Sequence, residues 1–188
     1  MHIAHARQDF HSICEIPTMK SIGPFNDIVI RTELVPGDLG SVIQMHGKLY
    51  KKEYDYGLHF ESYVAAGLHE FCEKLGTSRS RAWICEHGGQ IVGFLALMDR
   101  GDLAQLRYFI IDPAFRGIGL GRKLMDMYME HLNTSGFRGS YLLTTKELPA
   151  AAHLYTAYGF RLKEEHHAHH PFDKDVIEQR YEMFISKA

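Results

Sequence analysis

The segment Arg116–Gly121 reads RGIGLG and lies between an apolar strand and an amphipathic helix. The first turn of a helix presents unpaired N–H groups and the positive end of the helix dipole, so it attracts an anion such as a pyrophosphate. The three glycines lack a Cβ atom, which lets the backbone approach phosphate oxygens closely. Three basic residues add countercharge: Arg116, Arg122 and Lys123. The segment therefore predicts phosphate binding, with a simple tight turn as the alternative.

Two familiar phosphate-binding patterns do not fit this glycine segment. A Walker A loop ends in Gly-Lys followed by Ser or Thr, whereas Arg122 and Lys123 follow Gly121 here. A Rossmann fingerprint needs a further glycine three residues after its second one, and its strand usually opens the domain. The segment therefore matches neither the Walker A nor the Rossmann class of phosphate-binding loop.

Four histidines gather in His166–Asp173, which reads HHAHHPFD. Such a run suggests metal binding, but chelation needs ligands held on one side at a fixed geometry. The sequence offers no His-x-x-x-His pair on a helix and no cysteine partner. We therefore expect a surface loop and no metal site.

The hydrophobic periodicity predicts the elements that position these groups. Alternating or continuous apolar runs predict seven strands: Asp27–Leu34, Arg81–Glu86, Gln90–Met98, Leu103–Asp112, Ser140–Thr145, Phe160–Glu165 and Val176–Ile185. A helix that opens at Asp38 carries an apolar stripe that includes His46. Further stripes predict helices over Phe60–Leu75 and Leu120–Leu132. Pro149 is suited to a first helical turn and Gly159 to a C′ position, which predicts a short helix between them. This order predicts an α/β (α+β) sheet with helices on both faces, in a single domain over 27–188 after an irregular extension over 1–26.

The composition sets limits on partners and location. With 21 Lys plus Arg against 23 Asp plus Glu, the net charge of −2 offers no basic excess for nucleic acid or an anionic membrane. Three scattered cysteines do not form a disulfide framework, and the N-terminus lacks the order of a secretory signal. We expect a cytoplasmic protein with no nucleic acid or membrane partner. Whether it forms a homodimer is left open.

Two motifs in the correct order resemble the GCN5-related N-acetyltransferases, the GNAT family. The first is IIDPAFRGIGLG, Ile110–Gly121, which matches the family's phosphate-binding signature after a strand that ends in a proline turn. The second is LYTAYGF, Leu154–Phe160. The likeness covers roughly Asp27 to Ile185. It looks closest to the acetyltransferase domains that are fused to MarR-type regulators.

This resemblance implies a GNAT fold, with a mixed, mostly antiparallel central sheet that splays into a V between its fourth and fifth strands. It implies acetyl-CoA as cofactor and direct transfer of the acetyl group to a primary amine of a small molecule or a protein. By family position, the backbone of the strand end would bind the pantetheine arm and the acetyl carbonyl, and the glycine turn would bind the pyrophosphate. The implied cofactor residues are Phe109, Ile110, Ile111, Arg116, Gly117, Ile118, Gly119, Leu120, Gly121 and Arg122.

The resemblance also implies the chemistry of the remaining side chains. Tyr155 occupies the family position of the proton donor to the departing thiolate, and a phenol stays protonated at neutral pH. The alternative is a packed aromatic residue on a short helix. The fourth strand lacks the glutamate that many relatives carry, so no side-chain base is assigned, and Glu147 is a weak candidate. For the acceptor we expect Tyr56, His59 and Glu61 in the connection between the first two helices. A non-catalytic acyl-CoA sensor is the alternative function.

Overall fold

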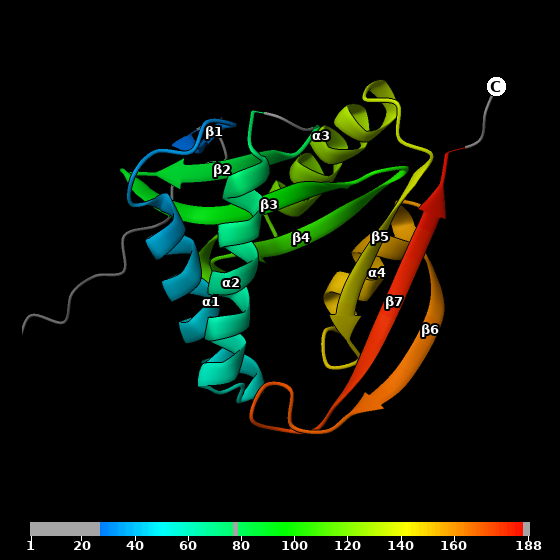
Figure 1. The fold of residues 1–188 in the computed structure, drawn as a ribbon. Helices are drawn as coiled ribbons and strands as arrows, with labels where there is room; N and C mark the ends of the chain where they lie inside the picture. Colours follow the sequence, from blue (N-terminus) through cyan, green and yellow to red (C-terminus); the bar gives the residue numbers. More distant parts are fainter. Residues whose placement is uncertain (1–26, 77–78, 186–188) are drawn as a thin grey trace, which may run out of the picture.

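The computed structural model describes residues 27–76 and 79–185, which form one seven-stranded sheet in the order β1-β2-β3-β4-β5-β7-β6 (Figure 1). The extension predicted over residues 1–26 lies outside the described residues. The strands are β1 (Val29–Arg31), β2 (Arg81–His87), β3 (Gln90–Arg100), β4 (Leu103–Ile111), β5 (Gly139–Thr145), β6 (Arg161–Ala168) and β7 (Val176–Phe184). Every neighbouring pair is antiparallel except β4 and β5, which are parallel.

Helices cover both faces of the sheet, as the sequence predicts. Helices α1 (Asp38–Tyr54) and α2 (Leu58–Lys74) lie on one face, and α3 (Leu120–Thr134) and α4 (Pro149–Ala157) lie on the other (Figure 1). Because successive strand residues point to opposite faces, the strands contribute side chains to two separate hydrophobic cores. Trp83 belongs to the α3 and α4 core, and its neighbour Ile84 belongs to the α1 and α2 core.

The sheet splits between β4 and β5. Their register pairs run only from Leu103 with Gly139 to Leu106 with Leu142, although β4 continues to Ile111 and β5 to Thr145. The strands therefore diverge into the expected V, which opens downward in Figure 1.

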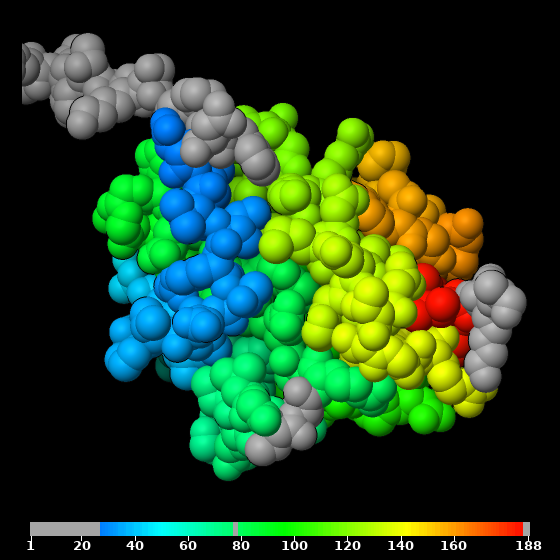
Figure 2. All heavy atoms as spheres, turned by 90° about the horizontal axis from the view of Figure 1, so that it is seen from above, coloured from blue at the N-terminus to red at the C-terminus, as the bar shows by residue number. Residues whose placement is uncertain are grey.

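The paired end of the V is closed by the segment between α3 and β5. The Arg138 N–H donates to the Asp102 carbonyl (2.8 Å), and the Ile185 N–H donates to the Arg138 carbonyl (3.0 Å). Figure 2 looks onto this end, where the yellow residues around 140 lie between the blue N-terminal elements and the red end of β7. Any ligand in the V therefore enters from the opposite end or from the faces.

A β-bulge interrupts β4 where the strands diverge. Phe94 of β3 pairs with Ile110, but Ala96 pairs with Arg107, so β4 contains one extra residue. Tyr108 sits in this bulge with φ +57°, a left-handed conformation that is an outlier for an aromatic residue. Neither Tyr108 nor Phe109 has a register partner in β3 or β5. No feature of the amino-acid sequence signals this bulge.

Two predicted boundaries need correction. The first predicted strand, Asp27–Leu34, pairs with β2 only over Val29–Arg31, because the Arg31 side chain then turns to bind Asp38 and Glu86. The predicted histidine loop starts too early, since His166 and His167 belong to β6 and pair with Glu178 and Ile177 of β7. Pairing with β7 overrides the local composition.

Candidate active site

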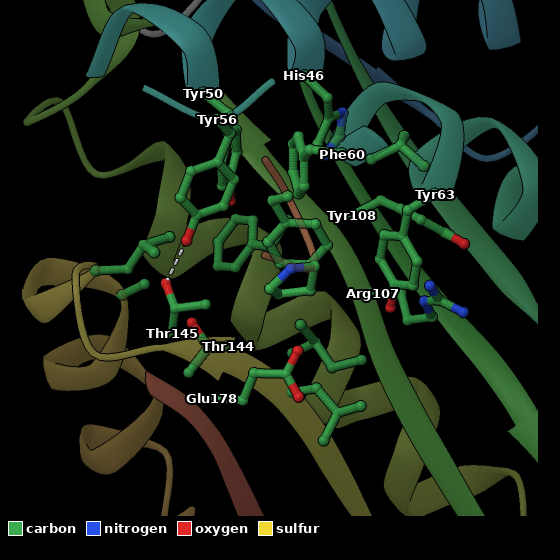
Figure 3. Close-up of a pocket in the computed structure, with 18 of the residues that line it drawn as sticks. His46, Tyr50, Tyr56, Phe60, Tyr63, Arg107, Tyr108, Thr144, Thr145 and Glu178 are labelled. Atoms are coloured by element: carbon green, nitrogen blue, oxygen red, sulfur yellow. Dashed lines mark hydrogen bonds between the residues drawn. The ribbon is translucent and has the colours of Figure 1, made fainter. Parts of the chain in front are cut away.

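A cavity of about 410 Å³ occupies the V between β4 and β5 (Figure 3). Side chains from α1, α2 and the connection between them line one side of it. The ends of β4 and β5, the start of α4, Glu178 of β7 and the β6–β7 connection line the rest. Residues between His46 and Glu178 that are far apart in the sequence thus meet at one site.

Aromatic rings form the wall of this cavity on the α1 and α2 side. The ring centroid of Tyr50 lies 4.4 Å from that of Phe60, and Tyr56 lies 5.1 Å from both Phe60 and Phe172. Tyr63 extends the wall, 5.6 Å from Phe172. We call Tyr50, Tyr56, Phe60, Tyr63 and Phe172 the aromatic wall. It suits an apolar or aromatic part of a ligand.

Tyr56 ties the aromatic wall to the far side of the V. Its hydroxyl bonds to Thr145 Oγ1 (2.7 Å) and donates to Glu147 Oε2 (3.0 Å). Glu147 also accepts from the Lys174 ammonium (2.7 Å). Burial raises the pKa of Tyr56 above its ordinary value, so the phenol stays protonated. This network joins the α1–α2 connection, the end of β5 and the β6–β7 connection.

His46 of α1 also faces the cavity and is only 3% exposed. Its Nδ1 lies 2.9 Å from the Val42 carbonyl, which makes Nδ1 the donor and leaves Nε2 as an acceptor. Burial lowers the pKa of His46 to about 4. The imidazole is therefore neutral at physiological pH.

Tyr155 of α4 reaches the cavity from the other face of the sheet. It is 6% exposed, and its ring packs 6.3 Å from Phe109 and 6.2 Å from Phe160. Within residues 27–76 and 79–185, no protein group hydrogen-bonds to its hydroxyl. Burial raises the pKa of Tyr155 well above its ordinary value, so the hydroxyl remains a proton donor at any physiological pH.

The glycine turn lies at the N-terminus of α3, beside the end of β4. Gly117 (φ +78°) and Gly119 (φ +93°) adopt left-handed conformations, and a Cβ at either would meet no heavy atom within 4 Å. Open space over a left-handed backbone is the cradle that an anion needs. Gly121 differs, because a Cβ there would contact Ile111, Leu154 and Phe109 at 3.5–3.8 Å. Gly121 thus links the turn to the cavity lining.

Arg116 has partners inside the protein. Its Nε donates to the Ile111 carbonyl (3.0 Å), and its Nη1 pairs with Glu53 of α1 (2.9 Å). The guanidinium therefore connects α1 to the end of β4.

The last residues of β4 point in different directions. Phe109 lines the cavity, whereas the side chains of Ile110 and Ile111 pack into the two opposite cores.

Of the three predicted acceptor residues, the structure brings only Tyr56 into the cavity. His59 is exposed and forms a short contact with Asp173. The Glu61 carboxylate lies over Gly47 of α1, outside the cavity. The α2 helix begins at Leu58, so both residues belong to its first turn.

The histidine-rich segment contacts acidic neighbours. His166 Nε2 lies 3.0 Å from a Glu178 carboxylate oxygen, and His170 Nδ1 lies 2.8 Å from a carboxylate oxygen of Asp175. Among the described residues, no group of three His, Cys, Asp or Glu is arranged to hold a metal ion.

Several cavity residues carry no sequence signal of function. Arg107, Tyr108 and Glu178 lie within predicted strands, and His46 lies within the apolar stripe of a predicted helix. The burial of His46 follows from that stripe. Its place in the cavity depends on contacts between distant segments.

Residues 46–160, more than half of the chain, match the acetyltransferase (GNAT) family. The parallel β4–β5 pair, the V and the glycine turn are consistent with that match. The chain belongs to this family. No helix within the described ranges is long and apolar enough to cross a membrane.

Individual relatives agree with the family. The chain is similar to the uncharacterized N-acetyltransferase YjgM of Escherichia coli, with 37% identity over 82 residues that cover 42% of this chain and 49% of the relative. It is also similar to the uncharacterized N-acetyltransferase MJ1207 of Methanocaldococcus jannaschii, with 30% identity over 89 residues, 44% of this chain and 39% of the relative. The chain thus matches at most about half the length of these curated relatives.

Solved structures share the fold. An acetyltransferase from Streptococcus agalactiae has a TM-score of 0.66 and 21% identity, over 86% of this chain and 100% of that one. A spermidine N-acetyltransferase from Vibrio cholerae in complex with CoA and spermine has a TM-score of 0.64 and 19% identity, over 85% and 96%. These likenesses show that the chain shares the GNAT fold.

Proposed function

We propose that this N-acetyltransferase uses acetyl-CoA and transfers the acetyl group directly to a primary amine held in the V. The observation that carries the proposal is the cavity itself. Tyr155 lines it from the α4 face, the glycine turn lies beside its lining at Phe109, and the aromatic wall lines it from the α1 and α2 face. The acetyl donor and the amine acceptor can therefore meet in the cavity while each contacts a different set of residues.

The residues present fit acetyl-CoA. When bound, acetyl-CoA supplies a thioester whose carbonyl carbon an amine can attack. The open backbone at Gly117 and Gly119 suits the pyrophosphate, with N–H groups from Gly117 to Arg122 as donors. The bulge suits the acetyl carbonyl, because Tyr108 and Phe109 lack register partners that would occupy their backbone groups. Phe109, Ile110 and Ile111 are thus the pantetheine-binding segment of this proposal.

Tyr155 is the proton donor of this mechanism. With acetyl-CoA bound, the amine nitrogen would form a bond to the carbonyl carbon while the bond between that carbon and sulfur breaks. The phenol hydroxyl would give its proton to the departing thiolate, and the proton that the amine loses would restore the phenol. Its raised pKa keeps it protonated until that step. Only one carboxylate, Glu178, and one neutral imidazole, His46, line the cavity, so the amine is best bound in its neutral form.

Tyr155→Phe tests this proposal. We expect kcat to fall about tenfold to hundredfold, with little change in acetyl-CoA affinity, because only the hydroxyl is removed. Release of free thiol measures kcat, and calorimetry measures affinity. The matched control is Tyr128→Phe, which removes a buried hydroxyl that bonds to Ser140 (2.6 Å) away from the cavity. Equal losses of kcat in both variants would contradict the donor role.

Finer points belong to the same proposal. Tyr56 is retained as an acceptor residue, whereas the positions of His59 and Glu61 do not support that role. A cytoplasmic location, a single domain over 27–188 and a resemblance to domains fused to MarR-type regulators rest on the sequence alone. A homodimer stays open. The sensor alternative is disfavoured, since the V contains space for an acceptor.

A further inference from the structure

Arg107 lies in the cavity beside the bulge. Its guanidinium carbon is 4.7 Å from the ring centroid of Tyr108 and 5.1 Å from that of Tyr63. Figure 3 shows it beside Tyr63, on the side of the cavity away from Tyr56 and Thr145. Two aromatic rings thus hold this cation one residue before the bulge that would bind the acetyl carbonyl.

No carboxylate pairs with Arg107 among the residues that the structure describes. Glu70 of α2 and Glu178 of the cavity lining have other partners, since Glu70 pairs with Arg100 and Glu178 contacts His166. Three other arginines in the described ranges also lack a carboxylate partner, but all three are exposed: Arg81, Arg122 and Arg161. Arg107 is the half-buried exception.

This arrangement favours an anionic ligand. A cation that is partly removed from water is unfavourable unless a counterion compensates it. The planar guanidinium fork matches a carboxylate, with which it can form two parallel hydrogen bonds. The rings of Tyr63 and Tyr108 fix the guanidinium, so less side-chain freedom is lost when such a ligand binds.

We propose that the acceptor is a small amine that carries a carboxylate, such as an amino acid, and that Arg107 binds this carboxylate. The inference rests on the proposed function and names the substrate class of the same site. The carboxylate would lie at Arg107, with the amine directed at the bulge. The side chain of the acceptor would lie against Tyr50, Phe60 and Phe172.

The charges of the cavity argue against a polyamine acceptor. A polyamine carries at least one further ammonium group, which Arg107 would repel. Among the described residues that line the cavity, Glu178 is the only acidic one, and it already contacts His166. The aromatic wall instead suits the apolar side chain of an amino acid such as phenylalanine or leucine.

Matched acceptors test the inference. Phenylalanine and phenethylamine differ only by the carboxylate, as do leucine and isoamylamine. We expect wild-type kcat/KM to favour the carboxylate member of a pair by about tenfold to hundredfold, the range for a hydrogen bond to a charged group. Arg107→Gln should bring this ratio close to one, and Arg107→Lys should retain part of it. A variant that merely lost stability would have a lower kcat/KM for both acceptors of a pair, and the ratio between them would not change.

The control is Arg138→Gln, which removes one positive charge from an exposed arginine that pairs with Asp102 outside the cavity. It should leave the ratio unchanged. A second readout that needs no turnover is the affinity of the CoA-loaded protein for N-acetylphenylalanine, measured by calorimetry. We expect Arg107→Gln to lower this affinity about tenfold or more.

The outcomes separate this inference from the proposed function. Turnover of phenethylamine or spermidine at least equal to that of the amino acids, unaffected by Arg107→Gln, overturns the inference and leaves the acetyltransferase intact. The absence of N-acetylphenylalanine binding in the wild type also overturns it. Failure to bind acetyl-CoA at all would instead overturn the proposed function.

Discussion

The glycine turn lies beside the end of β4, and the aromatic wall lines the cavity on the α1 and α2 side, yet the two are built in different ways. The turn is one contiguous segment, and its left-handed glycines expose backbone with nothing above it. The aromatic wall draws on two helices and on a strand connection more than a hundred residues further along the chain. Its members touch each other through side chains.

This difference shows which kind of site a sequence can display. Backbone recognition depends on local conformation, so neighbouring residues are enough to specify it. Side-chain recognition depends on which distant residues the fold brings together. In this molecule a short motif is enough to propose the cofactor side, whereas the residues of the acceptor side come together only in the fold.

The largest effect should come from the turn. Gly119→Val forces a β-branched residue into a left-handed conformation (φ +93°) and places its side chain where the pyrophosphate would lie. We expect acetyl-CoA affinity to fall at least a hundredfold, measured by calorimetry, because the backbone can no longer approach the phosphates.

Gly136→Val is the control for this variant. Gly136 also has a left-handed backbone (φ +74°) with open space above it, but it follows α3 at the other end of that helix. It should show a similar loss of stability with unchanged affinity. Equal affinity losses in the two variants would remove the distinction between the turn and an ordinary strained glycine.

A second test concerns the buried His46 of the acceptor side. Its folded-state pKa of about 4 lies below the ordinary value of 6.5, so the unfolded chain binds more protons between these pH values. The free energy of unfolding should therefore fall as the pH drops, with a contribution of about 2 kcal/mol between pH 7 and pH 5. Urea denaturation at both pH values measures it.

Replacement of this histidine isolates its contribution. His46→Leu should remove about 2 kcal/mol of that pH dependence, while His69→Leu, at an exposed position on α2, should not change it. A pH dependence that is the same in His46→Leu and in the wild type would show that His46 is not held neutral by burial.

The smallest effect should come from the Tyr56 hydroxyl. Tyr56→Phe removes its bonds to Thr145 and Glu147 and should lower the free energy of unfolding by about 1 kcal/mol. The acceptor KM should rise a few-fold, with acetyl-CoA affinity unchanged. A double-mutant cycle with Thr145→Val should give a coupling of about 1 kcal/mol. Zero coupling would mean that the network does not hold the V together.

The sequence predicts the layers of this fold but not its irregularities. Apolar stripes identify α1 to α3, and that of α1 already includes His46, which is buried. The bulge at Tyr108 is not predictable, because its unusual conformation is imposed by pairing with β3 and by the divergence from β5. His166 and His167 look like loop residues, and only their pairing with β7 makes them a strand.

The candidate site divides in the same way. Gly117, Gly119 and Tyr155 follow from two short motifs, since each motif fixes the local backbone. Arg107 stands in a strand where composition predicts nothing about a ligand. Its significance depends on Tyr63 and on the acids that pair elsewhere, which are facts of three-dimensional packing.

The two connections that close the cavity have an evolutionary consequence. Tyr56 lies in the connection between α1 and α2, and Phe172 and Lys174 lie in that between β6 and β7. Surface connections accept substitutions and insertions more readily than the elements they join. Substitutions in these two short connections can therefore reshape the part of the acceptor side that Tyr56 and Phe172 form, while the glycine turn, which lies in another connection, stays unchanged. The acceptor side can thus diverge independently of the segment proposed to bind the cofactor.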